Sequence, residues 1–290
     1  MRKNLREKAK NTQINFADEM QRIEAIFSNK GIIEFYKRDD YTHMFPQYTS
    51  IEDLYECGYF MKYPYSENYI NLSDMRSSLG ISKEDIKENN LEIMLDYFEC
   101  IYNLISFLFV QYRAGNLSLD IVDERYIYKI INNITNVLEK INYKLVQAED
   151  GYFNIIEKDA STTAVAELYS DISANVIEYR RYNLKGNLER KKEILYNLSN
   201  KFEPIRATLK ANNFSEIEDK TGDLLNNLDI RHNNKSGKNA KDIVKNMSNE
   251  ELEQWYDKTY DLLLMCFMFN NYLSFRDDIK DLNKNLKNKV

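Results

Sequence analysis

Apolar residues along most of the chain recur every three or four positions, which is the spacing that predicts amphipathic helices. Glycine or proline follows several of these stripes, where helices end. The stripes predict helices over residues 16–27, 91–112, 119–141, 161–183 (as one helix or two), 187–202, 215–228 and 248–275, with Pro204 in the first turn of a further helix. After Phe275 the chain is strongly charged, and we expect it to fray.

Serine and a carboxylate three residues later mark several helix starts, because each side chain can bond the other residue's backbone N–H. Three such pairs are Ser82 with Asp85, Ser215 with Glu218, and Ser248 with Glu251. Ser50 with Asp53 predicts a short helix through Met61, while the rest of residues 31–72 has the irregular pattern of loops.

Residues 143–157 break the helical pattern. Two β-rich runs flank Asp150-Gly151, and an Asp-Gly pair in that position predicts a hairpin. Only 8 of the 290 residues are glycine and 3 are proline, which disfavours sandwiches, barrels and glycine-rich phosphate loops. The sequence therefore predicts a mainly α fold, with helical bundles and a small β-hairpin near 143–157, divided into an N-terminal part (1–142) and a C-terminal part (143–290).

Composition narrows the chemistry further. The formal net charge is −6, and the 2 histidines and 3 widely spaced cysteines have no metal-ligand spacing, so we expect no metal and no cofactor. The basic N-terminus has no apolar segment after it, and the longest uninterrupted apolar run is Leu262–Phe269. A cytoplasmic protein without membrane association is expected.

The polar stretch after residue 228 is the first candidate for chemistry. It contains Arg231, His232, Asn233 and Asn234, between two apolar helical stripes. Arginine can stabilise a phosphate and histidine can move a proton near neutral pH, which together suit metal-independent RNA cleavage. The alternative is a polar helix connection in which Arg231 and His232 interact with the helix dipole.

Basic residues gather twice in this acidic chain, which suggests a path for a phosphate backbone if the fold brings the two groups together. The first cluster is Arg180, Arg181, Lys185, Arg190, Lys191 and Lys192, and the second is Arg231, Lys235, Lys238, Lys241 and Lys245. Of these, Arg180, Arg181, Lys185, Arg190, Lys235 and Lys238 are the candidate RNA contacts. The alternative is two solvated helix faces.

Aromatic residues are dense between Tyr55 and Tyr69, where they either complete a core or form a platform for a peptide or for bases. Cys100 and Cys266 fall in apolar stripes and predict small core residues. His43 lies near Asp39 and Asp40 and could act with those carboxylates, but the pattern favours a surface histidine.

The segments Glu178-Tyr-Arg-Arg-Tyr-Asn-Leu-Lys-Gly186 and Ile230-Arg-His-Asn-Asn234, followed by a long last helix, resemble the HEPN superfamily of bacterial abortive-infection and toxin proteins. The resemblance covers about the last half of the chain. Active members carry histidine four to six residues after the arginine, whereas positions 235–237 here are Lys, Ser and Gly. This difference from the family pattern implies either that His232 acts from an altered position or that the domain binds RNA without cleaving it.

Two functions follow as expectations. The first is an anti-phage abortive-infection-type protein that binds RNA and acts as a metal-independent endoribonuclease. In this mechanism Arg231 stabilises the phosphate, His232 is the acid or base, and Asn233 and Asn234 orient the RNA. The resemblance also implies a homodimer in which two such loops face each other. The alternative is a non-catalytic helical interaction, sensor or regulatory protein whose aromatic N-terminal part holds a protein partner or phage component.

Overall fold

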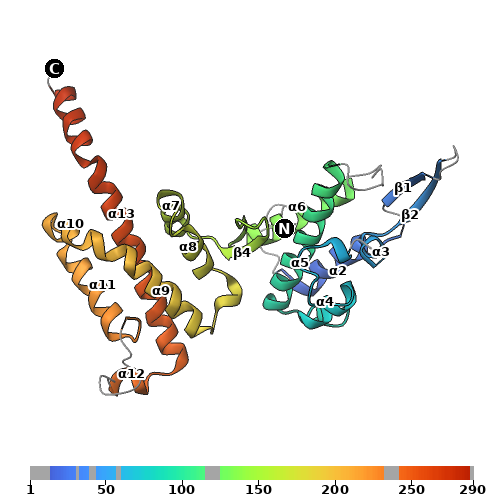
Figure 1. The fold of residues 1–290 in the computed structure, drawn as a ribbon, viewed down its shortest axis with the longest axis horizontal. Coiled ribbons are helices and arrows are strands. Elements are labelled where there is room, and N and C mark those ends of the chain that lie inside the picture. The colour runs from blue at the N-terminus through green and yellow to red at the C-terminus, as the bar shows by residue number, and fades with distance from the viewer. Residues whose placement is uncertain are drawn as a thin grey trace, which may run out of the picture. The chain divides into compact units, whose positions relative to one another are not determined.

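The computed structural model describes residues 14–30, 33–38, 44–56, 60–114, 125–231 and 242–287. The chain divides into two compact units, which we call unit 1 (Met1–Ile155) and unit 2 (Ile156–Val290), and both are mainly helical (Figure 1). The division falls inside a strand, whereas the sequence placed the boundary before the hairpin.

Unit 1 consists of helices and two β-hairpins. Its helical segments are α2 (Phe16–Phe27), α3 (Ile51–Leu54), η2 (Phe60–Lys62), α4 (Leu72–Ser78), η3 (Asp85–Lys87), α5 (Leu91–Arg113) and α6 (Arg125–Lys140). Its strands are β1 (Ile33–Arg38), β2 (Met44–Thr49), β3 (Tyr143–Gln147) and β4 (Phe153–Glu157), of which β4 crosses into unit 2. The predicted helices over 16–27 and 91–112 are confirmed; residues 115–124, at the start of the third, lie outside the described residues.

Polar side chains begin these helices as the sequence pattern requires. Asn15 accepts a hydrogen bond from the backbone of Asp18, and Ser50 accepts one from Asp53. Ser82 and Asp85 bond each other's backbone N–H at 3.4 and 2.8 Å, the predicted capping box, although it opens only the short η3 turn. After Ser50 the α-helix α3 ends at Leu54 and a π-helical turn follows at Tyr55 and Glu56, while residues 57–59 of the predicted helix through Met61 lie outside the described residues.

Helix α5 forms the centre of unit 1 and packs against both α2 and α6. Its buried hydrophobic side chains are Met94, Leu95, Tyr97, Phe98, Cys100, Ile101, Leu104, Ile105 and Leu108. Among the described residues, its segment Leu91–Gln111 is the one helical stretch long and apolar enough to cross a membrane. In the most apolar 18 residues of this segment, 61% of the residues are buried inside the protein. Such burial is what a core helix requires.

The predicted hairpin near 143–157 is confirmed as the antiparallel pair β3–β4. Gly151 adopts a φ of 87°, which few residues other than glycine reach, and this allows the turn to close. Asn103 of α5 bonds both the N–H and the C=O of Phe153, and Glu99 accepts the N–H of Ile155 at 2.7 Å. Two polar side chains of α5 thus anchor β4 within unit 1.

Strands β1 and β2 contradict the expectation that residues 31–49 form loops. They pair antiparallel, with Ile33 opposite Thr49 and Tyr36 opposite Pro46. Pro46 weakened the strand pattern, because proline donates no ladder hydrogen bond. In a two-stranded sheet each strand has an unpaired edge, so a proline can be tolerated there.

Unit 2 is helical beyond the end of β4. Its segments are α7 (Ala160–Leu168), α8 (Ser173–Tyr179), η4 (Tyr182–Leu184), α9 (Leu188–Phe202), η5 (Glu203–Ile205), α10 (Arg206–Ala211), α11 (Ser215–Asn227), α12 (Asp242–Asn246) and α13 (Asn249–Lys287). Helix α13 packs against α7, α9, α10 and α11, so its first half is the centre of this unit (Figure 1). The 161–183 stripe resolves into two helices, and Pro204 is the second residue of the short η5 turn before α10.

Two predictions for unit 2 are wrong. Ser215 makes no capping bond with Glu218; the helix begins after Phe214, and Glu218 is fully buried, where it pairs with Arg206 and Lys210. The chain also stays helical to Lys287 instead of fraying after Phe275. The Ser248–Glu251 capping box, by contrast, is confirmed by reciprocal bonds of 3.0 and 3.1 Å.

Candidate functional site

The segment that follows α11 is fixed on α9 up to residue 231. Asp229 has a φ of 65°, which turns the chain sharply, and its carboxylate pairs with Lys192 at 2.8 Å. Ile230 is buried, and the N–H of Arg231 donates to the C=O of Leu225 at 3.1 Å. The backbone that leads into the candidate segment is therefore anchored up to Arg231.

The side chain of Arg231 is turned inward. Its guanidinium pairs with Glu203 and donates to the C=O of Ser199 at 3.1 Å, and only 13% of the side chain is exposed. Arg231 therefore ties the end of α11 to the end of α9. The other candidate residues of this site, and most of the second cluster, lie outside the described residues: His232, Asn233, Asn234, Lys235, Lys238 and Lys241. Lys245 of the second cluster lies on α12 and is exposed.

Arg180 of the first basic cluster belongs to a polar network over the core of unit 2. It pairs with Asp261 at 2.6 Å and with Asp159 at 3.4 Å, and it lies over the ring of Tyr260. Tyr260 in turn stacks on Tyr179 with 4.1 Å between ring centroids. Burial raises the pKa of Asp159, but hydrogen bonds from Thr162 and Ser161 and the charge of Arg180 outweigh it and leave that pKa lowered.

The remaining cations of this cluster differ in how far they are neutralised. Arg190 makes two hydrogen bonds to Glu178 at 2.6 and 2.7 Å and one to Glu193 at 2.5 Å. These hydrogen bonds raise the pKa of Arg190. Lys185 is exposed, and Arg181 is half-buried.

Lys191 is almost fully buried between two carboxylates of α13. Its Nζ lies 2.8 Å from Glu253 and 2.7 Å from Asp257, and Tyr179 donates to Asp257 at 3.0 Å. Burial raises the pKa of Glu253, but a hydrogen bond from Lys191 is the largest of the effects that lower it overall. Much of the first cluster thus holds helices together with intramolecular partners.

A second place of interest is a pocket in unit 1, which we call the aromatic pocket. Its volume is about 290 Å³. Its lining comes from the loop before α4, from α5 and from the β3–β4 turn: Tyr63, Pro64, Tyr65, Asn103, Ser106, Phe107, Val110, Gln147, Asp150, Gly151, Tyr152 and Phe153.

The rings of the aromatic pocket meet edge to face. Tyr65 lies 4.6 Å from Tyr152 at 73°, and Tyr63 lies 5.5 Å from both Tyr65 and Phe107. Tyr63 is buried, whereas Tyr65 is 38% exposed. The arrangement forms a corner of aromatic surface that opens to solvent.

One carboxylate lies in this aromatic corner. Asp150 accepts the N–H of Tyr152 at 2.9 Å and also interacts with the hydroxyl of Tyr65. Burial, followed by this hydrogen bond and the charge of Asp150, raises the pKa of Tyr65. No cation among the described residues pairs with Asp150, so the pocket offers a negative charge beside π surfaces.

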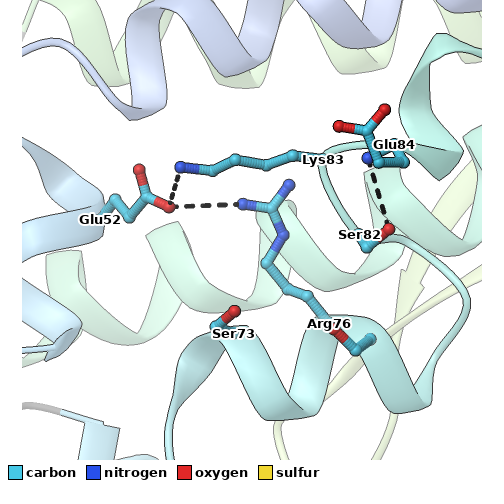
Figure 2. Close-up of a pocket in the computed structure, with 7 residues that line it drawn as sticks. Glu52, Ser73, Arg76, Ser82, Lys83 and Glu84 are labelled. Carbon is cyan, nitrogen blue, oxygen red and sulfur yellow. Dashed lines mark hydrogen bonds and ion pairs between the residues drawn. The ribbon is translucent and has the colours of Figure 1, made fainter.

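A polar pocket of about 320 Å³ lies elsewhere in unit 1, lined by Glu52, Ser73, Arg76, Ser77, Ser82, Lys83 and Glu84. Figure 2 shows Lys83 and Arg76 pointing toward the carboxylate of Glu52, at 2.8 and 3.9 Å. Arg76 also pairs with Glu24 at 3.0 Å. The basic groups already have acidic partners, which favours a structural role over anion binding.

The described residues contain no group of three or more histidine, cysteine, aspartate or glutamate side chains placed to hold a metal ion. Cys100 and Cys266 are buried as predicted, and burial raises their thiol pKa to about 12 and about 11. A raised pKa leaves little thiolate at neutral pH, so neither is suited to nucleophilic chemistry.

The sequence pointed to the right segment for the aromatic pocket but not to its assembly. Between Tyr55 and Tyr69, the buried residues Tyr55, Phe60 and Tyr63 complete the core, whereas Tyr65 is exposed. The wall opposite comes from Tyr152, next to the Asp150-Gly151 turn. The sequence signal for this second wall is Tyr152, an aromatic residue directly after the predicted Asp150-Gly151 turn.

No protein-family model, no curated protein and no solved structure matches this chain, so the geometry of its own residues has to carry the functional conclusion.

Proposed function

We propose that this chain is a non-catalytic protein-interaction component of a bacterial defence or toxin system, and that its aromatic pocket holds a basic side chain of a partner protein. The defence setting comes from the resemblance to HEPN-type abortive-infection proteins. The observation that carries the binding role is the corner of Tyr63, Tyr65, Phe107 and Tyr152 beside the carboxylate of Asp150.

Aromatic faces attract cations because the ring quadrupole places negative charge above and below the ring. Each such contact contributes about 0.5–1 kcal/mol at an exposed site and more where water is excluded. The carboxylate of Asp150 adds a negative charge at the edge of this aromatic corner. A lysine or arginine side chain matches both features, whereas a carboxylate is repelled.

The state of the first basic cluster also supports protein binding over general RNA binding. Arg180, Arg190 and Lys191 all pair with carboxylates of unit 2. Charges that are already neutralised release few counterions when a phosphate approaches, which weakens the main driving force for nucleic-acid binding.

The proposal is tested with short peptides on the full chain. Glycine-serine heptapeptides carry one central lysine, arginine, norleucine or glutamate, and NMR titration measures their binding. We expect the lysine and arginine peptides to bind and the neutral and acidic ones to be at least about threefold weaker, from the size of one cation–π contact.

Variants locate the binding. Tyr65→Ala removes one wall and Asp150→Asn removes the charge with little change of shape, so each is expected to weaken the basic peptides by about threefold or more. Tyr196→Ala is the control, since Tyr196 is an exposed tyrosine of unit 2. Equal binding of all four peptides, or full binding by Asp150→Asn, would contradict the proposal.

RNA binding with cleavage is the second candidate, and one contact favours it. The Lys192–Asp229 ion pair brings the first basic cluster next to the segment that leads into Arg231 and His232. Lys192 of the first cluster therefore lies near the chain segment that enters the second cluster at Arg231. A phosphate path shared by the two clusters requires such proximity.

Incubation of the purified protein with total RNA in EDTA tests this candidate. His232→Ala is the informative variant, because Arg231 has a structural partner and its loss would disturb the fold. His43→Ala, which changes the chain's other histidine, is the matched control. Cleavage lost only in His232→Ala supports the ribonuclease; no cleavage by the unmodified protein, or equal cleavage by all three, excludes it.

A further inference from the structure

The C-terminal part of α13 has an apolar stripe that its own unit leaves uncovered. The stripe consists of Met265, Met268, Tyr272, Phe275, Ile279, Leu282 and Leu286. All but Met268, which is partly buried against the core of unit 2, are exposed, from 39% at Tyr272 to 58% at Leu282 and Leu286. We call this set the α13 stripe.

The spacing of the α13 stripe is 3, 4, 3, 4, 3, 4 along the sequence. This is the heptad repeat, in which positions a and d form the seam between two supercoiled helices. Met265, Tyr272, Ile279 and Leu286 then occupy a, and Met268, Phe275 and Leu282 occupy d. Three successive heptads are the minimum for which this pattern indicates a coiled coil.

Apart from Met268, the stripe lies away from the face of α13 that packs on the core of unit 2. Tyr256, Tyr260, Leu263 and Phe267 face that core and are buried. Further along the helix, the same face carries the polar residues Asn270, Asn271 and Ser274. Beyond this point α13 therefore has no apolar face toward the core of unit 2. Figure 1 shows this red end of α13 running beyond α10.

The helix continues to Lys287 although its last turns bury nothing in unit 2. Ion pairs of Lys280 with Asp277 and of Lys284 with Asp281, each three residues apart, lie away from the stripe. Such pairs add only a few tenths of a kcal/mol each. A helix of this kind gains most of its stability from packing of its apolar face.

We propose that the α13 stripe is a dimerisation seam, occupied by the same stripe of a second copy of this chain in a parallel coiled coil. Isoleucine at a with leucine at d, as at Ile279 and Leu282, favours two parallel strands. A parallel, in-register pair aligns every layer of the stripe with its own counterpart.

Flanking charges favour the parallel orientation. In a parallel pair each g residue meets the e residue of the partner's next heptad, so Asn271 meets Arg276 and Asp278 meets Asn283. An antiparallel pair centred on residue 277 would instead bring Asp278 against its counterpart and Arg276 against its counterpart. Like charges at these positions are destabilising.

Sedimentation equilibrium of the full chain tests the dimer. The unmodified chain is expected to show a concentration-dependent dimer. The double variant Ile279→Asn, Leu282→Asn is expected to be monomeric, because it places amides in two layers of the seam. The double variant Lys280→Asn, Asp281→Asn is the matched control: it introduces the same residue twice beside the stripe, leaves the net charge unchanged, and is expected to remain dimeric.

Orientation is tested by a cysteine at the seam. Cys57 is the chain's third cysteine besides the buried Cys100 and Cys266, and its change to serine removes it from the experiment. Leu286→Cys in this Cys57→Ser background is expected to form an interchain disulfide under mild oxidation, because parallel helices place the two positions side by side. A monomeric unmodified chain, or equal dimerisation by both double variants, would overturn the seam. A dimer without the disulfide would overturn the parallel orientation. Neither result depends on the aromatic pocket, so the proposed function is judged separately.

Discussion

The carboxylate of Glu24 on α2 accepts hydrogen bonds from both terminal nitrogens of Arg76 on α4, at 3.1 and 3.0 Å. The two residues are 52 positions apart in the sequence. Tyr97 donates to the same carboxylate at 2.9 Å from α5. The Arg76 side chain is 3% exposed. One buried ion pair therefore links three helices of unit 1, and its charges depend on each other because water cannot replace either partner.

Removal of one partner of this pair is expected to be costly. Glu24→Gln should lower the free energy of unfolding by about 1.5–3 kcal/mol, because the buried Arg76 then loses its charged hydrogen-bond partner and keeps only the longer 3.9 Å pair with Glu52. Urea denaturation followed by far-UV circular dichroism measures the change. Arg22→Ala, which removes an exposed pair with Glu19, is the control and should stay within about 0.5 kcal/mol. Equal effects of the two variants would show that the buried pair has no special role.

Acid should weaken unit 1 through Glu52. Burial raises the pKa of Glu52, but hydrogen bonds from Lys83 and Ser28 and the charges of Lys83 and Arg76 leave it below its ordinary value of 4.5. The unfolded chain then takes up this proton at a higher pH than the folded one, so the stabilisation is present above pH 4.5 and falls as the pH drops through the folded pKa.

Urea midpoints measured from about pH 6 to about pH 3 test this dependence. Glu52→Gln should lower the midpoint at the upper end and flatten the acid decline. Glu84→Gln is the comparison, since its pair with Lys87 is exposed and the decline should be unchanged. An acid decline equally steep in Glu52→Gln would count against the assignment.

Arg231 is expected to matter for stability whether or not the residues that follow it are catalytic. Loss of its pair with Glu203 and its bond to Ser199 in Arg231→Ala should cost about 1–2 kcal/mol. Urea unfolding followed by fluorescence of Trp255, the single tryptophan, reports on unit 2. In a double-mutant cycle, Glu203→Ala should cost less in the Arg231→Ala background than alone; additive losses would mean that the pair is not coupled.

Gly222 is a place where the usual helix rule should fail. Alanine in a helix is ordinarily more stable than glycine by about 1 kcal/mol. A Cβ at Gly222 would lie 3.0 Å from a terminal nitrogen of Arg206, whose guanidinium pairs with the buried Glu218. Gly222→Ala should therefore give no gain by Trp255 fluorescence in urea. In an Arg206→Ala background the same change should gain about 1 kcal/mol, and a full gain in both backgrounds would refute the crowding.

Sequence patterns predicted most helices because local rules decide them. The stripe from Leu91 to Tyr112, the Ser248–Glu251 box and the Asp150-Gly151 turn depend on neighbours within a few residues, and all three are present. The β1–β2 hairpin was missed because Pro46 weakens a strand pattern without forbidding an edge. After Phe275, lysine and aspartate surround the few apolar residues of the α13 stripe, and this charged composition predicts fraying although the heptad spacing continues.

The sequence by itself determined that this chain is mainly helical, where most helices begin and end, and which residue types are available for chemistry. It could not determine which charges are free. Arg180, Arg190 and Arg231 read as exposed cations in a one-dimensional pattern, but tertiary packing gives each a carboxylate partner. Likewise, only the fold places Tyr152 against Tyr65. Such pairings join residues distant in sequence, and their energy depends on burial, which exists only once the helices have packed.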